Sequence, residues 1–545
     1  MKRRLDLADI QGNIVMPYGR FGFPVVRHFF FHIGNPAAGR KFVEQVRQAV
    51  TTAERWRSSG DANTQAPERP MVAVNIGFSF LGLLALALPT DTLREMPAEF
   101  IDGMAKRWSI LGDIGPSAPD KWDQIWRDAV NVEERQIHVW ISLTAQIKPD
   151  GTPVDELAAR TMWLKQAATA SAGVNLLSGH KGPNAEYQVS SARMTTLPTG
   201  QTVPTAKEHF GFTDAISDPT FAGQYDGAEE TEYSIGSGKI RPGHKNWTPL
   251  ATGEFILGHA SESQELPPVA MPWSFTRNGT FMAYRKLHQN IAKFRDYVGQ
   301  QASLFQKVTA AVSFEAAKET LLAKMIGRWR NGFPIAIAPT YDEFLSLKEQ
   351  WADIPALLLK RSSDRTKEES ARLNSYQRLI TDFRYKDDAD GTKCPLSAHI
   401  RRTNPRDALD PLLHDKSHTP DTMLSNRRRI MRRGLPYGEH IDDDASEHGV
   451  IFNVLCSSLF RQFEFIQQQW VNYSGSFGAG NDTDPLTGIR TGEAKFVIPA
   501  DEKKNGSPFI CANIPAFVET RGGEYFFLPS LTALREIAEG SVDPT

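Results

Sequence analysis

Stretches with the composition of β-strands alternate with stretches of helical periodicity along the whole chain. Val25–Ile33 (VVRHFFFHI), rich in β-branched and aromatic residues, is the clearest predicted strand. Other strands of the first half are predicted at Met71–Phe80 and Ile137–Leu143, and helices at Ala38–Thr52 and Asp155–Ala172. This order is too irregular for a doubly wound parallel sheet, and no dinucleotide-binding glycine pattern or P-loop stands in a suitable context. The pattern therefore predicts an α+β fold, with antiparallel strands covered by helices on one face.

The second half repeats the order of strand and then helix. It follows a connection rich in Thr, Pro, Gly and Ser, Lys181–His209, which we interpret as an inter-domain segment. Its recognisable elements are Gly253–His259, Gly279–Tyr297, Ile451–Trp470 and Ala516–Arg535, the last predicted as strand, turn, strand and helix. A chain of 545 residues exceeds the size at which one core keeps growing. We therefore expect two α+β domains, residues 1–200 and 201–545, the second with a helical or mobile surface insertion around 341–390.

The overall charge and the cysteine content exclude several classes of protein. A formal net charge of −2 gives no global attraction to nucleic acid or to an anionic membrane. Three scattered cysteines make neither a disulfide framework nor a CxxC site. The basic N-terminus, MKRR, continues into Asp6 and Asp9 instead of an apolar run, so a signal peptide is not expected. The apolar run Val72–Leu88 is predicted to be a buried strand followed by a helix, and a cytoplasmic protein is expected.

One histidine lies among arginines in the stretch TKCPLSAHIRRTNPRD, Thr392–Asp407. An imidazole binds zinc, copper, nickel or haem iron, and guanidinium groups suit the carboxylates or phosphates of a ligand. Iron held in a group that carries propionates would satisfy both His399 and the arginines Arg401, Arg402 and Arg406. The alternative is a structural histidine on a basic, solvated segment.

Three further stretches have residues that such a site would need. In HFGFTDAISDPTF, Asp214 is either a turn cap or a working acid/base. In SNRRRIMRRGLPYGEH, five arginines indicate a solvated face or a polyanion site. In RQFEFIQQQW, the amphipathic pattern is most simply that of a helix packed on the core.

Together these stretches resemble the dye-decolourising peroxidase family, and the resemblance covers most of the chain. Seven segments stand in the family's order: DIQGNIV, NIGFSFLGLLAL, EFIDGMAKRWSILGD, KMIGRWRNGFP, CPLSAHIRRTNPR, RQFEFIQQQW and RGGEYFFLPSLTALR. The resemblance implies two ferredoxin-like domains of the dimeric α+β barrel type, with haem b held mainly by the second. It also implies a peroxidase that reduces H2O2 and oxidises phenolic or dye-like donors, and it allows a homo-oligomer. A haem-binding or haem-handling protein with weak peroxidase activity is the alternative.

Carried over to this chain, the resemblance implies His399 as the proximal ligand, Asp214 as the distal acid/base and Arg432 as the distal arginine. It further implies Asp484, with Asp482 next, as the carboxylate partner of the histidine. Arg401, Arg402 or Arg406 would pair with the propionates, whereas Arg427–Arg429 are expected at the surface or in an interface. Trp470 and Tyr437 are candidates for electron transfer to large donors, with plain packing as the alternative.

The family's GxxDG turn is Gly211–Ala215 here, so alanine replaces the last glycine. If the position needs a positive φ, alanine strains it by ~1 kcal/mol or more. An unperturbed aspartate titrates near ~3.9 and a histidine near ~6.5, so an aspartate base stays ionised in acid where a histidine would not. Peroxide turnover is therefore expected to be best at acidic pH.

Overall fold

In the computed structural model, residues 5–19, 21–57, 66–181, 186–197, 200–266, 269–309, 313–360, 364–473, 475–490, 492, 494–500 and 506–543 are described. The predicted basic start of the chain, residues 1–4, lies outside them.

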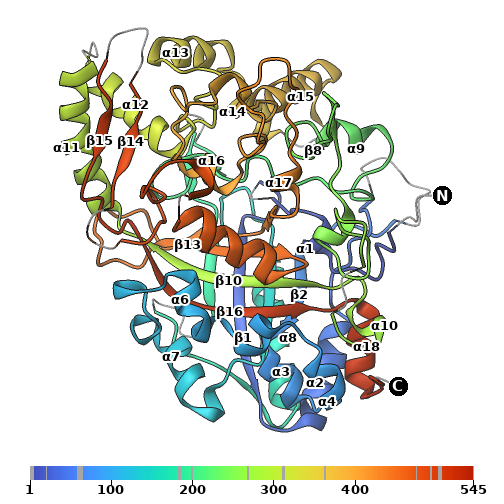
Figure 1. The fold of residues 1–545 in the computed structure, drawn as a ribbon. Helices are drawn as coiled ribbons and strands as arrows, with labels where there is room; N and C mark the ends of the chain where they lie inside the picture. Colours follow the sequence, from blue (N-terminus) through green and yellow to red (C-terminus); the bar gives the residue numbers. More distant parts are fainter. Residues whose placement is uncertain are drawn as a thin grey trace.

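A large sheet, to which both halves of the chain contribute, organises the fold (Figure 1). Its strands run in the order β11-β13-β10-β16-β2-β3-β1-β4, and every pairing in it is antiparallel. The first half supplies β1 (Val25–Ile33), β2 (Val72–Phe78), β3 (Val139–Ala145) and β4 (Val174–Leu176), with β5 (Gln188–Ser191) beside β1. The second half supplies β10 (Thr280–Gln289), β11 (Met431–Arg432), β12 (Leu435–Tyr437), β13 (Gly449–Cys456) and β16 (Val518–Leu528). The predicted α+β class with antiparallel sheets is confirmed.

The two halves are joined through one strand pair and one shared core. Strand β16 meets β2 where Phe527 pairs with Phe78. Both phenylalanines belong to a buried apolar cluster that takes residues from both halves, from Leu5 to Val542. Helices α2 (Pro36–Arg47), α8 (Asp155–Ala170) and α18 (Leu531–Glu539) lie together beside the sheet (Figure 1). Because sheet and core run through both halves, the division near residue 200 stays a prediction.

Smaller apolar clusters are built on the second half. Helices α11 (Ile291–Thr309) and α12 (Phe314–Ile326) pack with the hairpin β14–β15 (Phe496–Ile498 and Phe509–Cys511) at one end of the molecule (Figure 1). The predicted insertion is helical where it is described, with α13 (Tyr341–Gln350), α14 (Ile354–Leu359) and α15 (Lys367–Thr381). Phe344 and Ile380 bury these helices against Trp329, so the insertion has a core of its own.

Most predicted elements are present, but their ends and types differ in places. The helix predicted to reach Thr52 ends at Arg47, because Thr51 N–H instead donates to Val74 O of β2. The helix after β13 consists of two π-helical segments, η8 (Leu459–Glu464) and η9 (Ile466–Val471). In the predicted element 253–259, only residues 253 and 254 have regular structure, as the end of the 3-10 helix η5 (Thr252–Glu254), and turns and bends follow.

The predicted turn at Gly522 and Gly523 is wrong, because β16 continues through both glycines, with a register shift in its pairing with β10 between Thr520 and Gly522. A Cβ on Gly522 would lie 1.9 Å from Cδ1 of Trp126, and one on Gly523 would lie 2.4 Å from Sδ of Met104. The glycines therefore allow side chains of the first half to approach the strand. Glycine within a strand can thus indicate a close contact instead of a turn.

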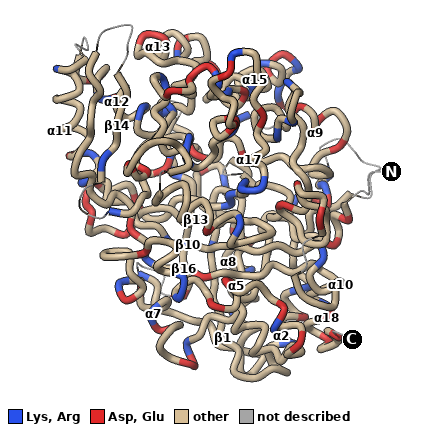
Figure 2. Tube along the Cα trace, in the orientation of Figure 1, with Lys and Arg blue, Asp and Glu red and all other residues tan. Residues whose placement is uncertain are grey.

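Lys and Arg positions lie among Asp and Glu positions over most of the chain (Figure 2), with the arginine run 427–433 as an exception. Within the described ranges, no helix combines the length and the apolarity that a membrane crossing requires.

The close approach at Gly522 predicts that two glycine-to-alanine substitutions differ in their effect on stability. Gly522→Ala should lower the free energy of unfolding by about 1–3 kcal/mol, because the new methyl group overpacks the contact with Trp126. Gly299→Ala is the matched control: it lies in α11, and a Cβ there would have no atom within 4 Å, so it should be neutral or stabilise by up to about 1 kcal/mol. Urea unfolding of both variants measures the difference, and equal effects would contradict the packing account.

Candidate haem-type active site

A cavity of about 400 Å³ lies over the β10, β13 and β16 part of the sheet. Its sheet side includes Leu287 from β10 and Val450 and Phe452 from β13. His399, Asp214, Arg406 and Arg432 also line it, so four of the six predicted site residues meet in one place.

His399 is held by a buried carboxylate. It begins helix α16 (His399–Thr403), and its Nδ1 lies 2.8 Å from Oδ2 of Asp484. The other oxygen of Asp484, Oδ1, accepts the backbone N–H groups of Leu486 and Thr487 at 2.9 and 2.8 Å. Asp484 is fully buried, whereas the imidazole is about 24% exposed and faces the cavity. With Nδ1 donating to Asp484, Nε2 is left with its lone pair, as a metal ligand requires.

The ion pair lowers the pKa of Asp484 and raises the pKa of His399. Burial raises the pKa of Asp484, but the charge of His399 and the hydrogen bonds outweigh it and hold that pKa well below its usual range. Burial lowers the pKa of His399, but Asp484 outweighs it and raises that pKa. In the protein without a bound metal, the stabilisation from Asp484 is present above ~3.9 and is lost as the pH falls through its lowered pKa. The stabilisation from His399 is present below ~6.5 and is lost as the pH rises through its raised pKa.

Asp214 and Arg432 form a second pair on the same cavity. Arg432 lies on β11, and its Nη1 donates to Oδ1 of Asp214 at 2.8 Å. Its Nη2 donates to the carbonyl of Ile216 at 3.1 Å, which ties the arginine to the loop that carries the aspartate. Both side chains are about one third exposed, and both charges act on the imidazole of His399. The carboxylate is thus neither a buried cap nor a solvated surface group.

The loop after Asp214 has strained backbone. Ala215 has a φ of 59° and Ser217 a φ of 61°, a region that costs a residue with a Cβ roughly 1–2 kcal/mol. The altered GxxDG turn therefore keeps the positive φ that glycine would favour, and the neighbouring contacts, including Arg432 with Ile216 O, hold it there.

The two predicted anion-binding arginines have different surroundings. Arg406 lines the cavity and donates to the carbonyl of Phe383 at 3.1 Å and to Oγ of Ser217 at 3.2 Å. Arg402 is fully buried outside the cavity lining, where it donates to the carbonyls of Trp470 at 2.5 Å and Asp482 at 2.6 Å. Arg402 therefore fixes the segment after η9, and only Arg406 is placed to meet a ligand.

Arg285, Arg328, Arg429 and Arg490 also line the cavity, and none of them was recognised as a site residue in the sequence. Arg328 donates to the carbonyls of Gly332 and Ile380, and Arg429 to those of Gly238 and Ser237. Burial lowers the pKa of each to about 9, and the nearby positive charge of Arg406 adds to the effect. The sequence signal for Arg328 and Arg429 is weak. Arg328 lies in KMIGRWRNGFP, a segment that resembles the family, and Arg429 lies in the arginine run 427–433.

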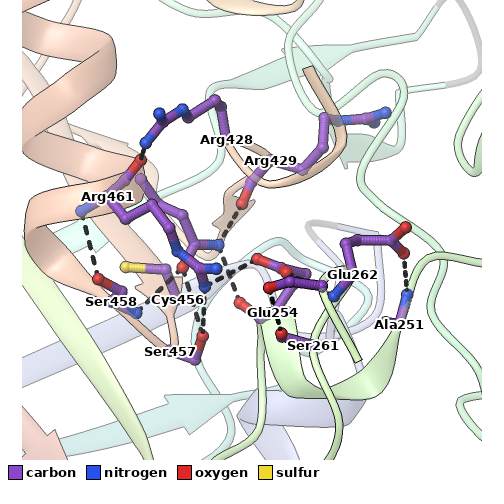
Figure 3. Close-up of polar contacts among 12 residues, drawn as sticks. Ala251, Glu254, Ser261, Glu262, Arg428, Arg429, Cys456, Ser457, Ser458 and Arg461 are labelled. Atoms are coloured by element: carbon purple, nitrogen blue, oxygen red, sulfur yellow. Dashed lines mark hydrogen bonds and ion pairs between the residues drawn. The ribbon is translucent and has the colours of Figure 1, made fainter. Parts of the chain in front are cut away.

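The expectation that Arg429 lies at the surface is wrong, since it is only 6% exposed. Figure 3 shows why neighbouring arginines differ: Arg428 reaches Arg461 O at 2.6 Å, whereas the side chain of Arg429 points away from that network. The backbone carbonyl of Arg429 accepts Nε2 of Gln462 at 2.6 Å, and Arg461 pairs with the buried Glu254 at 2.9 Å. The run is thereby anchored to η8.

The remaining candidates resolve into structural roles. Asp482 accepts a hydrogen bond from Ser397 at 3.1 Å, so of the two carboxylates considered, Asp484 is the one that contacts His399. Trp470 and Tyr437 are each 2% exposed and belong to apolar clusters, as the packing alternative expected.

A carboxylate-bonded histidine and a carboxylate–arginine pair thus share one cavity over an α+β sheet. Comparison with known proteins agrees. Residues 9–169 match the family described as the DyP dimeric alpha+beta barrel domain. Peroxidase 2 of Mycetinis scorodonius is 27% identical over 97% of this chain and 87% of its own length. A multifunctional dye peroxidase of Amycolatopsis is 28% identical over 97% of this chain and 96% of its own length.

Solved structures show the same similarity. An ancestral D-type dye decolorizing peroxidase superposes with a TM-score of 0.69 at 25% identity, covering 98% of this chain and 100% of that one. A dye-decolorizing peroxidase in complex with 2,6-dimethoxyphenol gives a TM-score of 0.67 at 25% identity over the same shares. Over nearly its whole length the chain is similar to dye-decolorizing peroxidases, and it is an oxidoreductase that acts on hydrogen peroxide.

The positive φ of Ala215 predicts that glycine is better there than alanine. Ala215→Gly should raise the free energy of unfolding by about 1 kcal/mol, because glycine adopts this backbone without a Cβ clash. Ala371→Gly, at an exposed position inside α15, should lower it by about 1 kcal/mol. Denaturant titration of both variants reports the signs; a loss of stability in Ala215→Gly would contradict the strain.

Proposed function

We propose that the cavity holds haem b, whose iron Nε2 of His399 would bind. The fit rests on three features of the described residues: a largely apolar cavity, an imidazole with one free nitrogen, and a concentration of positive charge at one side. Arg328, Arg406 and Arg429 all contact Ser217, at 3.5, 3.2 and 3.5 Å. Three guanidinium groups gathered on one residue favour an anionic ligand, and the two propionates of haem b would supply that charge.

When bound, haem supplies an iron that accepts the peroxide and takes up its two oxidising equivalents. Asp484 keeps the proton on Nδ1 of His399 and increases the electron donation of the imidazole, which favours cleavage of the O–O bond. Asp214 takes a proton from the inner oxygen of H2O2 and delivers it to the outer oxygen, which leaves as water. Arg432 stabilises the negative charge that develops on the leaving oxygen.

The pairing of Asp214 with Arg432 is the observation that carries this assignment. A guanidinium at 2.8 Å favours the ionised form of a carboxylate, which is the form that can accept a proton. Electrons then come from an organic donor. A solved relative holds 2,6-dimethoxyphenol, which supports phenols as one donor class here.

The alternative, a haem-handling protein with weak peroxidase activity, has one observation in its favour: the strained backbone at Ala215 beside the acid/base. The rate of dye or phenol oxidation by the purified protein separates the two. Turnover at rates typical of enzymes, on the order of 1–10³ per second, supports the peroxidase over the haem-handling protein.

Replacing the axial ligand should remove the cofactor's signature. His399→Ala is expected to lose the haem Soret band after reconstitution with hemin, because no other ligand replaces the imidazole on that side. His414→Ala, at a side chain that is 70% exposed, should keep the band. Absorption spectra of both variants make the comparison, and an unchanged band in His399→Ala would place the ligand elsewhere.

The acid/base assignment predicts an acidic optimum. Turnover of 2,6-dimethoxyphenol should persist as the pH falls to ~4, because the nearby guanidinium favours the ionised carboxylate, and should decline where Asp214 becomes protonated. Asp214→Asn should lower kcat/KM for H2O2 by about 10²–10⁴-fold and remove the acidic limb of the profile. An optimum near neutral or alkaline pH that survives in Asp214→Asn would refute the role of this residue.

A further inference from the structure

Tyr385 and Cys394 lie together on the segment that leads to helix α16. Both side chains are fully buried, and both belong to one apolar cluster. Tyr385 also lines the cavity of the candidate site, whereas Cys394 does not. Within the described ranges, the hydroxyl of Tyr385 has no nitrogen or oxygen partner. A phenol of the cavity wall is thus packed with a thiol that the cavity does not reach.

Arg401 and Asp388 hold the two residues in place. Cζ of Arg401 lies 4.3 Å from the centre of the Tyr385 ring, and its Nη1 donates to the carbonyl of Cys394 at 2.8 Å. Oδ2 of Asp388 accepts the backbone N–H of Cys394 at 2.8 Å, and the backbone N–H of Asp388 donates to the carbonyl of Tyr385 at 2.9 Å. Arg401 and Asp388 are themselves paired at 3.1 Å. The same two side chains therefore fix both the ring and the cysteine.

The thiol of Cys394 is enclosed and protonated. Burial raises its pKa to about 11, against the charge of Arg401 and the contact with the Tyr385 hydroxyl. Sγ would lie 3.3 Å from a Cβ placed on Gly327, so a side chain there would crowd it. A protonated thiol is a poor nucleophile, and the chemistry open to it beside a tyrosine is that of radicals.

We propose that Tyr385 and Cys394 form a self-modification site, at which peroxide in the absence of a donor joins Sγ of Cys394 to the ring carbon next to the phenolic carbon of Tyr385. The proposal rests on the proposed peroxidase function. Tyr385 borders the cavity in which the oxidising equivalents arise, and a phenol gives up an electron and a proton more readily than its apolar neighbours. The resulting thioether would close the segment 385–394 directly before the helix that begins with His399.

Atoms and electrons balance with one H2O2 as the only oxidant. The enzyme oxidised by peroxide holds two oxidising equivalents. The first takes one electron from Tyr385, whose phenolic proton leaves, and the thiol sulfur then adds to the ring as the thiol proton leaves. The second equivalent takes the remaining electron, and the ring C–H proton moves to the oxygen and restores the phenol. Two electrons and two protons are released, and they convert the H2O2 into two waters.

A second tyrosine–cysteine pair provides an internal control. Tyr297 and Cys511 are buried in another apolar cluster, and this thiol also acts on its neighbouring phenol. Neither residue lines the cavity, and the hydroxyl of Tyr297 donates to the carbonyl of Ala512 at 2.8 Å. A reaction driven from the cavity should therefore modify the first pair and spare the second.

Mass spectrometry of the haem-loaded protein tests the site. After H2O2 without donor, trypsin digestion should release the peptides that begin at Tyr385 and at Cys394 as one joined species, lighter than their sum by two hydrogen atoms. Excess 2,6-dimethoxyphenol should suppress the link, because it takes the same oxidising equivalents. Oxidation of Cys394 to a sulfinic or sulfonic acid without a link, a link in the haem-free protein, or equal linking of Tyr297 to Cys511 would each overturn the proposal.

Two variants locate the bond. Tyr385→Phe, which removes only the hydroxyl, and Cys394→Ser should each lack the joined species and keep the haem Soret band, whereas Cys511→Ser should link like the wild type. A joined species that persists in either of the first two variants overturns the assignment. Oxidation of 2,6-dimethoxyphenol in the same samples separates this inference from the proposed function: turnover without a link overturns the inference alone, and the absence of both overturns both.

Discussion

The hydrogen bond between His399 and Asp484 is the contact on which the site depends. It joins segments 85 residues apart and fixes the ring at the start of α16. The carboxylate can remain buried because two backbone N–H groups and the imidazole satisfy it, and an unpaired buried charge would be costly. Arg490 continues the arrangement by donating to the carbonyl of Asp484 at 3.0 Å. The loop around Asp484 is therefore built to present one carboxylate to one histidine.

The cavity wall around loop 214–218 concentrates positive charge and backbone strain. Four arginines of the cavity wall, Arg328, Arg406, Arg429 and Arg432, contact the loop 214–218, which also has two residues with positive φ. Such an arrangement is unfavourable in isolation, because buried like charges repel and a Cβ at positive φ clashes. A dianionic ligand would offset the repulsion. The gathered arginines and the strained loop lower the stability of this region. The arginines are also the groups that haem propionates would contact, and the loop carries the carboxylate that a peroxide would meet.

Sequence reasoning reached the fold class, and through the family resemblance it proposed the residues of the two pairs that meet at the cavity. A run rich in aromatic and β-branched residues marks β1, and the stretches that resemble the family contain His399, Asp214 and Arg432. It could not separate Arg402 from Arg406, since both follow the same histidine and only the path of the chain decides which one meets the cavity. It mistook Gly522 for a turn because the reason for that glycine, the Trp126 ring, lies far away in the sequence. Arg429 was misplaced for the same reason: its carbonyl partners come from a distant loop.

The central claim, that Asp484 polarises an axial histidine, is tested most directly by the Fe(III)/Fe(II) reduction potential of the haem-loaded protein. Asp484→Asn should raise the potential above that of the wild type, because a less anionic imidazole stabilises Fe(III) less. Asp482→Asn, which changes a carboxylate bonded to Ser397 instead, is the matched control and should leave the potential nearly unchanged. An Asp484→Asn potential equal to that of the wild type would contradict the account.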